Sequence, residues 1–91
     1  MNVKEAVLLA KLEIANLFAD ERAENIGLEE VDYDDALKNW RITIGFSRPW
    51  DETFLPLMST GPARRPRSYK VITIAENGEV VSVRNHAKAD A

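Results

Sequence analysis

The 91-residue chain contains no cysteine and a single histidine, His86. Without cysteine there is neither a disulfide framework nor a thiolate nucleophile, and one histidine alone argues against a structural zinc site. Long hydrophobic runs are also missing, because Glu5, Lys11 and Glu13 interrupt the apolar N-terminal segment. That interruption argues against a signal-peptide core and a membrane-spanning helix. These absences predict a cytoplasmic protein that has no membrane association and carries no metal or other cofactor.

Basic residues are scarce in the first part of the chain. Residues 1–35 carry ten acids against three bases, whereas residues 36–91 carry nine bases against five acids. The net charge of −3 gives no overall attraction to a polyanion, so nucleic acid is not an expected partner. The two regions of opposite charge are expected to face each other or a protein partner.

No proline or glycine occurs before Gly27, so nothing interrupts a helix in the N-terminal region. Asn2 followed by Glu5 has the spacing of an N-cap and a capping box. Gly27 suits the left-handed residue that follows a helix, and we therefore predict one long helix over residues 3–24. Apolar residues recur at helical spacing along one stripe, Val3, Val7, Ala10, Ile14, Leu17 and Phe18, and along a second strip, Leu8, Leu12, Ala15 and Ala19.

The later stretches alternate between apolar and polar residues, which is typical of strands with one buried face. Residues 28–33 are the predicted first strand, with Val31 and Tyr33 inward. Residues 40–46 are the second strand, in which every second residue is large and apolar. The third and fourth strands flank Asn77-Gly78, a dipeptide that favours a type I′ turn with positive φ at both residues.

The predicted turn fixes the register of the last hairpin. Counting outward from it, the opposed pairs are Ala75–Val80, Ile74–Val81, Thr73–Ser82 and Ile72–Val83. Alternation puts the isoleucine–valine pairs on the core side. The order of elements is then α-β-β-β-β, and we predict a single α+β domain over 1–91. In it, the helix packs across a four-stranded antiparallel meander, and the tail 86–91 frays.

The connection over 47–68 is unusually long and holds all four prolines. Long connections in compact domains are often functional. This one combines apolar residues with arginines, the side chains that anchor protein interfaces. We therefore predict a protein-binding site that consists of Trp50, Phe54, Arg64, Arg65 and Arg67.

Three other interpretations of these features stay open. The apolar part of 47–68 can instead cap the core and leave the arginines solvated. The arginine cluster can bind a small anionic ligand, which would make the protein a sensor. Self-association through an exposed Leu9 or through the second helical strip would give a homo-oligomer.

Other groups of reactive side chains form no recognisable site. Five carboxylates lie within residues 29–35, and such a cluster could form a calcium or magnesium site. The spacing, however, lacks the glycine and terminal glutamate of an EF-hand loop. Alternation also separates Glu29 from Glu30 and Asp32, so we interpret these residues as a charged edge strand. His86 has no second histidine and no cysteine to work with, and no serine lies in a nucleophile elbow. We do not expect an enzyme.

The N-terminal Lys-Glu-Ala helix, the strand over 40–46 and the closing hairpin together resemble PepSY-like domains. The family's acidic-x-Gly-Glu-Val turn is matched by Glu76-Asn77-Gly78-Glu79-Val80. The resemblance implies a small module with a PepSY/cystatin-like order of elements that binds or restrains other proteins, proteases among them, without catalysis. The proline-rich segment 47–68 and the missing export signal depart from the family pattern, so no functional residue is carried over.

Overall fold

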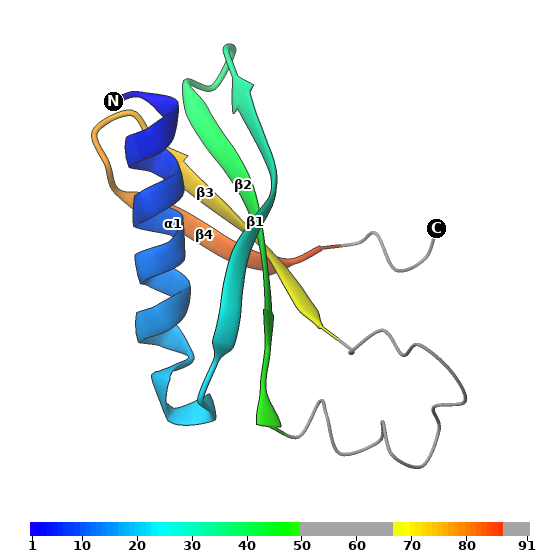
Figure 1. Ribbon diagram of the computed structural model, residues 1–91. Coiled ribbons are helices and arrows are strands. Elements are labelled where there is room, and N and C mark those ends of the chain that lie inside the picture. Colours follow the sequence, from blue (N-terminus) through cyan, green and yellow to red (C-terminus); the bar gives the residue numbers. More distant parts are fainter. Residues whose placement is uncertain (50–66, 87–91) are drawn as a thin grey trace.

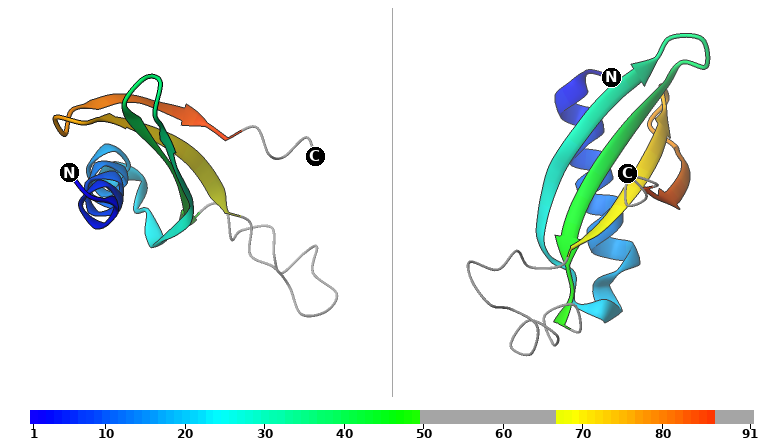
Figure 2. Two further views of the ribbon diagram at one scale, coloured as in Figure 1. Left: turned by 90° about the horizontal axis from the view of Figure 1, so that it is seen from above. Right: turned by 90° about the vertical axis from the view of Figure 1, so that its right-hand side faces the viewer.

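The computed structural model describes residues 1–49 and 67–86. Within these ranges the chain forms a helix, a short 3₁₀ turn and four strands, in the order α-β-β-β-β (Figure 1). Their bounds are α1 Val3–Leu17, η1 Ala19–Glu21, β1 Glu24–Asp34, β2 Asn39–Ser47, β3 Ser68–Ala75 and β4 Val80–Asn85. The strands form one antiparallel sheet of order β1-β2-β3-β4, and α1 lies on one of its faces (Figure 2). The predicted α+β fold is confirmed.

The start of α1 is the predicted capping box. The Asn2 side chain accepts a hydrogen bond from the Glu5 N–H, and the Glu5 carboxylate accepts one from the Asn2 N–H, both at 2.9 Å. This arrangement satisfies two of the backbone donors that the first turn leaves without partners. A sequence pattern of only four residues was enough to locate this end of the helix.

The predicted end of the helix was wrong. α1 stops at Leu17 rather than at residue 24, and Arg22, with φ 55°, is the left-handed residue that turns the chain. Gly27 lies inside β1, where it pairs with Gly45, and β1 begins at Glu24 instead of residue 28. The early end follows from pairing, because residues 24–27 align with the end of β2 and gain ladder hydrogen bonds there that a longer helix would forgo.

The core lies between α1 and the face of the sheet that α1 covers. On the strands, the predicted inward positions of β2 are confirmed for Ile42, Ile44 and Phe46, which have no exposed surface, while Trp40 packs at the edge of this core. Full burial of an isoleucine or phenylalanine side chain contributes about 1.5–3 kcal/mol to the free energy of folding. The fully buried apolar residues are Ala6, Ala10 and Ile14 of α1 and Ile42, Ile44, Phe46, Ile72 and Ile74 of β2 and β3.

The hairpin of β3 and β4 forms, but its turn differs from the predicted one. Of the turn residues, Gly78 alone has a positive φ, 93°, and its N–H donates to the Ala75 carbonyl at 2.9 Å. The turn therefore has three residues, 76–78, and a glycine in the third position, rather than two residues of type I′. As a consequence Ile74 faces Val80 and not Val81, while the predicted Thr73–Ser82 and Ile72–Val83 pairs are confirmed.

From Ser82 onward the register of β4 is again the predicted one, because Val81 is an extra residue with no partner in β3. The shift falls between the Thr73 and Ile74 pairs, and it leaves the Val81 side chain 58% exposed. Bulges of this kind bend an edge strand and move side chains from one face to the other. The predicted core position of Val81 was therefore wrong, and Val80 packs against the core in its place.

Tyr33 connects β1 to the β3–β4 turn across the sheet. Its ring meets Trp40 edge-on, with centroids 4.8 Å apart, and its hydroxyl donates a hydrogen bond to the Glu76 carboxylate. That carboxylate raises the pKa of Tyr33 from 10.0 to about 12, chiefly through the hydrogen bond, because ionising the phenol would remove the donated proton and place two anions together.

The alkaline titration of Tyr33 tests this contact. The folded protein holds the phenolic proton more tightly than the unfolded chain does, so the contribution to stability is fully present below pH 10 and is lost as the pH rises toward 12. Replacing Glu76 with glutamine should lower the pKa of Tyr33 toward 10.0. The absorbance of tyrosinate at alkaline pH measures this pKa, and the Tyr33→Phe variant shows which part of the titration curve belongs to Tyr33. Identical titrations of the parent and the Glu76→Gln variant would contradict the assignment.

Candidate functional site

Of the five residues that the sequence singled out for partner binding, Arg67 is the one that the structure describes. Trp50, Phe54, Arg64 and Arg65 lie outside the described residues. The strands take in Ser47 and Ser68, so the connection between β2 and β3 runs over residues 48–67. Its two ends, at Arg48 and Arg67, show how this segment is attached to the fold.

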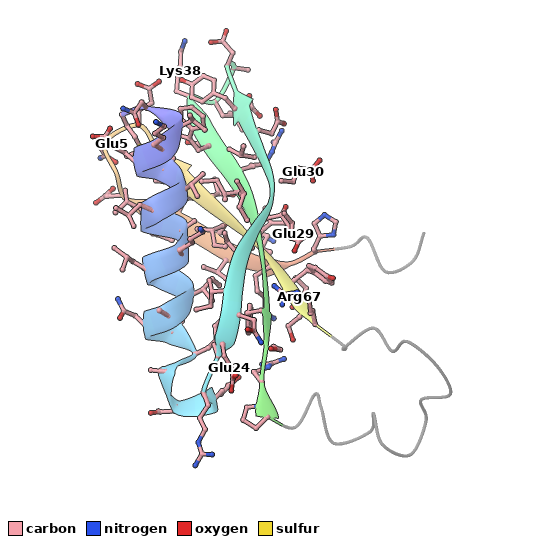
Figure 3. All side chains as sticks on the ribbon, in the orientation of Figure 1. Glu5, Glu24, Glu29, Glu30, Lys38 and Arg67 are labelled. Carbon is pink, nitrogen blue, oxygen red and sulfur yellow. The ribbon has the colours of Figure 1, made fainter. Side chains whose placement is uncertain are left out.

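Arg67 crosses the outer face of the sheet, the face that α1 does not cover, and reaches β1. Its guanidinium Nη2 donates to the Asn25 carbonyl at 2.8 Å and lies 4.0 Å from a Glu29 carboxylate oxygen (Figure 3). The path of this side chain depends on Gly45, because a Cβ there would lie 3.0 Å from Nη2 and 2.8 Å from the Glu29 carboxylate. The guanidinium is thus engaged within the chain, which favours an anchoring role over capture of a small anion.

Arg48 holds the other end of the connection. Its guanidinium donates to the Glu21 carboxylate and to the Ser68 hydroxyl, both at 2.6 Å, and so joins η1 to the first residue of β3. The same group lies 5.7 Å from the centre of the Phe18 ring and 5.4 Å from that of Phe46. Simultaneous contacts with aromatic rings and with two hydrogen-bond acceptors suit a planar guanidinium and not an ammonium group.

Both ends of the connection are therefore fixed by arginines to other parts of the fold. Arg48 ties one end to η1 and β3, and Arg67 ties the other end to β1. Loops that carry function are usually positioned by a rigid scaffold. The sequence drew attention to Arg67 as part of a basic cluster, but it gave Arg48 no role. The available signal was its place directly after β2, two residues beyond the buried Phe46.

An open groove lies at the same end of the sheet, between the end of α1 and β4. It measures about 760 Å³ and is lined by Leu17, Phe18, Lys70, Val83, Arg84 and Asn85. The Lys70 ammonium donates to the Asn85 side chain and lies 5.6 Å from the centre of the Phe18 ring. An apolar wall beside the Lys70 ammonium suits a partner that offers apolar and acidic side chains.

The sequence contained a signal for this groove that was not used. Lys70 alternates with Ile72 and Ile74, which are buried, so it occupies the covered face of the sheet. A lysine at such a position indicates that the core is open at that point, because a buried ammonium without compensation is costly. The helix therefore stops covering the sheet between Ile72 and Lys70 of β3.

The outer face of the sheet carries ion pairs between β2 and β1. Arg41 on β2 contacts Asp32 at 3.0 Å and Asp34 at 3.2 Å on β1. The His86 imidazole, just after β4, lies 4.0 Å from a Glu30 carboxylate oxygen. A hydrogen bond from the Leu37 N–H, helped by the charge of Arg41, holds the pKa of Asp34 below its ordinary value. These contacts lie within one molecule, and among the acids of β1 they engage Asp32 and Asp34 with Arg41.

The predicted separation of Glu29 from Glu30 was wrong. The register of β1 shifts between Leu28 and Glu30, and this irregularity leaves Glu29 on the outer face, next to Gly45. Even so, residues 1–49 and 67–86 contain no group of three acidic or histidine side chains placed to hold a metal ion. The bulge allows Glu29 to meet Arg67, which is how the acidic strand and the basic connection come into contact.

A second apolar surface runs along α1. The second helical strip is exposed as its spacing predicts, with Leu8 57% and Leu12 50% exposed. Leu9, in contrast, packs against the core, so the expectation that it is exposed was wrong. A shallow groove beside the strip is lined by Val3, Lys4, Val7, Leu8, Lys11 and Leu28.

Comparisons with protein-family models, with curated proteins and with solved structures found no match to this chain. The resemblance to PepSY-like domains stays a prediction from the sequence. In the part of the chain that the structure describes, no helix has the length and apolar character needed to cross a membrane.

Proposed function

We propose that this protein is a cytoplasmic, non-catalytic module that binds another protein, in the manner of an inhibitor, immunity protein or regulator. The contact surface is the 47–68 segment together with the end of the sheet beside it. The observation that carries the proposal is that arginines fix both ends of that segment to the fold, through Glu21 and Ser68 on one side and Asn25 on the other.

The surroundings of the anchored ends support the same function. The groove at Phe18 and Lys70 lies beside Arg48, which touches the same phenylalanine ring. Trp50 and Phe54 follow Arg48 closely in the sequence, and large aromatic side chains dominate the energetics of protein interfaces. In this proposal Trp50 and Phe54 supply the apolar contacts, and Lys70 of the groove together with Arg64 and Arg65 supplies contacts for the acidic groups of the partner.

Replacing Trp50 and Phe54 together with alanine tests the proposed function. The partner is first captured on the intact chain from cells of the native host, and its affinity is then measured with purified components. The double variant should raise the Kd more than about tenfold, because each ring is expected to contribute over about 1 kcal/mol to binding. Leu37→Ala is the matched control, since Leu37 is 66% exposed in the β1–β2 turn, away from the anchored ends.

Thermal melting separates binding from a core-capping role. If both side chains serve the interface, the melting temperature of the double variant should stay close to that of the parent. A fall of more than about 8 °C would mean that they contribute over about 1 kcal/mol to the fold of a domain of this size. That result, with unchanged affinity, would favour the interpretation in which the segment caps the core.

A further inference from the structure

The two edges of the sheet differ in how they are protected. The β1 edge carries Glu24, Glu29, Glu30, Asp32 and Asp34 with no basic residue. A run of acidic side chains on an edge strand discourages pairing with another strand. Two β1 strands placed side by side would also bring like charges together. The β1 edge is therefore closed to a second copy of the chain.

The β4 edge carries one acid and one base. Glu79 precedes the strand, Arg84 lies near its end, and both side chains are exposed. Among the described residues neither side chain has a hydrogen bond or ion pair, in contrast to the paired carboxylates of β1. The His86 N–H donates to the Tyr69 carbonyl, so by alternation the Val83 N–H points away from the sheet and is available to another strand.

Glu79 and Arg84 share a face because of the bulge. Five positions apart in a regular strand, they would point to opposite faces. The extra residue Val81 removes this difference. Glu79 bonds to Ala75 through the backbone and Arg84 pairs with Val71, and both partners are outer-face positions of β3. The two opposite charges thus lie at the two ends of one edge and on one side of the sheet.

We propose that β4 is a homodimer interface, in which a second copy of this chain pairs antiparallel with β4 across a two-fold axis. Such an axis passes through the middle of the strand and brings Glu79 of one copy beside Arg84 of the other, twice. An interface that is self-complementary in charge is what a two-fold dimer requires. Pairing β4 with β1 of another copy would instead give an open chain of molecules. The dimer also brings the exposed Val81 against a neighbouring strand.

This dimer goes beyond the proposed function, since it uses the outer edge of β4 and needs neither Trp50 nor Phe54. A failure of one proposal therefore leaves the other standing. The dimer extends the antiparallel sheet through both molecules, while α1 stays on the same face in each copy. A strand pair of this length buries little surface, so we expect a weak association that is seen at high micromolar concentration.

Sedimentation of the full 91-residue chain tests the dimer. At low micromolar concentration the mass should be the monomer value of 10.3 kDa, and at high micromolar concentration it should approach twice that value. Glu79→Arg and Arg84→Glu should each weaken dimerisation at least about tenfold, because each places like charges at both contacts. The double variant carrying both changes restores opposite charges and should dimerise within about threefold of the parent.

The charge reversal makes the test specific to this edge. Asp20→Arg changes the net charge as Glu79→Arg does, at an exposed position in η1, and it should leave dimerisation unchanged. Amide exchange at Val83 should slow as the concentration rises. A parent chain that stays monomeric at high micromolar concentration would overturn the proposal. So would a double variant that is as weak as the single ones.

Discussion

Replacing Phe46 with alanine is expected to lower the free energy of unfolding by about 3–5 kcal/mol, the usual cost of removing a buried phenylalanine. Phe46 is fully buried, and its ring packs on Phe18 with centroids 5.0 Å apart. Phe18 follows α1 directly, so this pair holds the end of the helix against the end of β2. Domains have only about 5–15 kcal/mol of stability in total, so the variant should be close to unfolding.

Urea unfolding followed by circular dichroism measures this loss. Val81→Ala is the control, because Val81 is an exposed residue of the same sheet and its truncation should change the stability by less than about 0.5 kcal/mol. Both variants are compared at low protein concentration. A loss below about 1 kcal/mol for Phe46→Ala would contradict its place at the centre of the core and would indicate that neighbouring side chains collapse into the cavity.

Replacing Arg48 with alanine should lower the free energy of unfolding by about 2–3 kcal/mol. Its hydrogen bonds to Glu21 and Ser68 involve a charged donor, for which about 1.5–3 kcal/mol is typical. The contacts with the Phe18 and Phe46 rings add to this. Arg48→Lys is the matched control: it keeps the charge but cannot contact both acceptors in one plane, so it should recover less than half of the loss.

A double-mutant cycle isolates the contact with Glu21. Arg48→Ala, Glu21→Gln and the double variant are unfolded in urea, and the coupling energy between the two side chains should be about 1 kcal/mol. Additive losses would mean that Arg48 acts through its packing on the aromatic rings. If Arg48→Lys were as stable as the parent, the paired hydrogen bonds of the guanidinium to Glu21 and Ser68 would have no role in anchoring the connection.

The class of the fold could be predicted because the local sequence patterns are strong. The apolar stripe of α1, the alternation in β2 and the Asn-Gly turn each specify an element, and a single helix and a one-sided sheet have few ways to bury their apolar faces. Element ends were harder to predict. Helix propensity favoured continuation past Leu17, but residues 24–27 gain more by pairing with β2, and no local pattern reports that competition.

The candidate site was less accessible to sequence reasoning. The sequence identified Arg67 as part of a basic cluster, yet the path of its side chain to the Asn25 carbonyl depends on Gly45, a residue of a different strand. Arg48 acts through Glu21 and Ser68, which are distant in sequence and meet only after the sheet forms. Trp50, Phe54, Arg64 and Arg65 stay predictions, because they lie outside the described residues.

The amino-acid order by itself determined the order α-β-β-β-β, the capping box at Asn2 and the inward positions of β2, because helix and strand periods are read over neighbouring residues. Only the tertiary structure decided where α1 ends, that Glu29 faces Arg67, and that the bulge at Val81 puts Glu79 and Arg84 on one face. The reason is physical: register shifts and bulges are set by the match between whole strands, and moving one by a single residue reverses every side chain that follows.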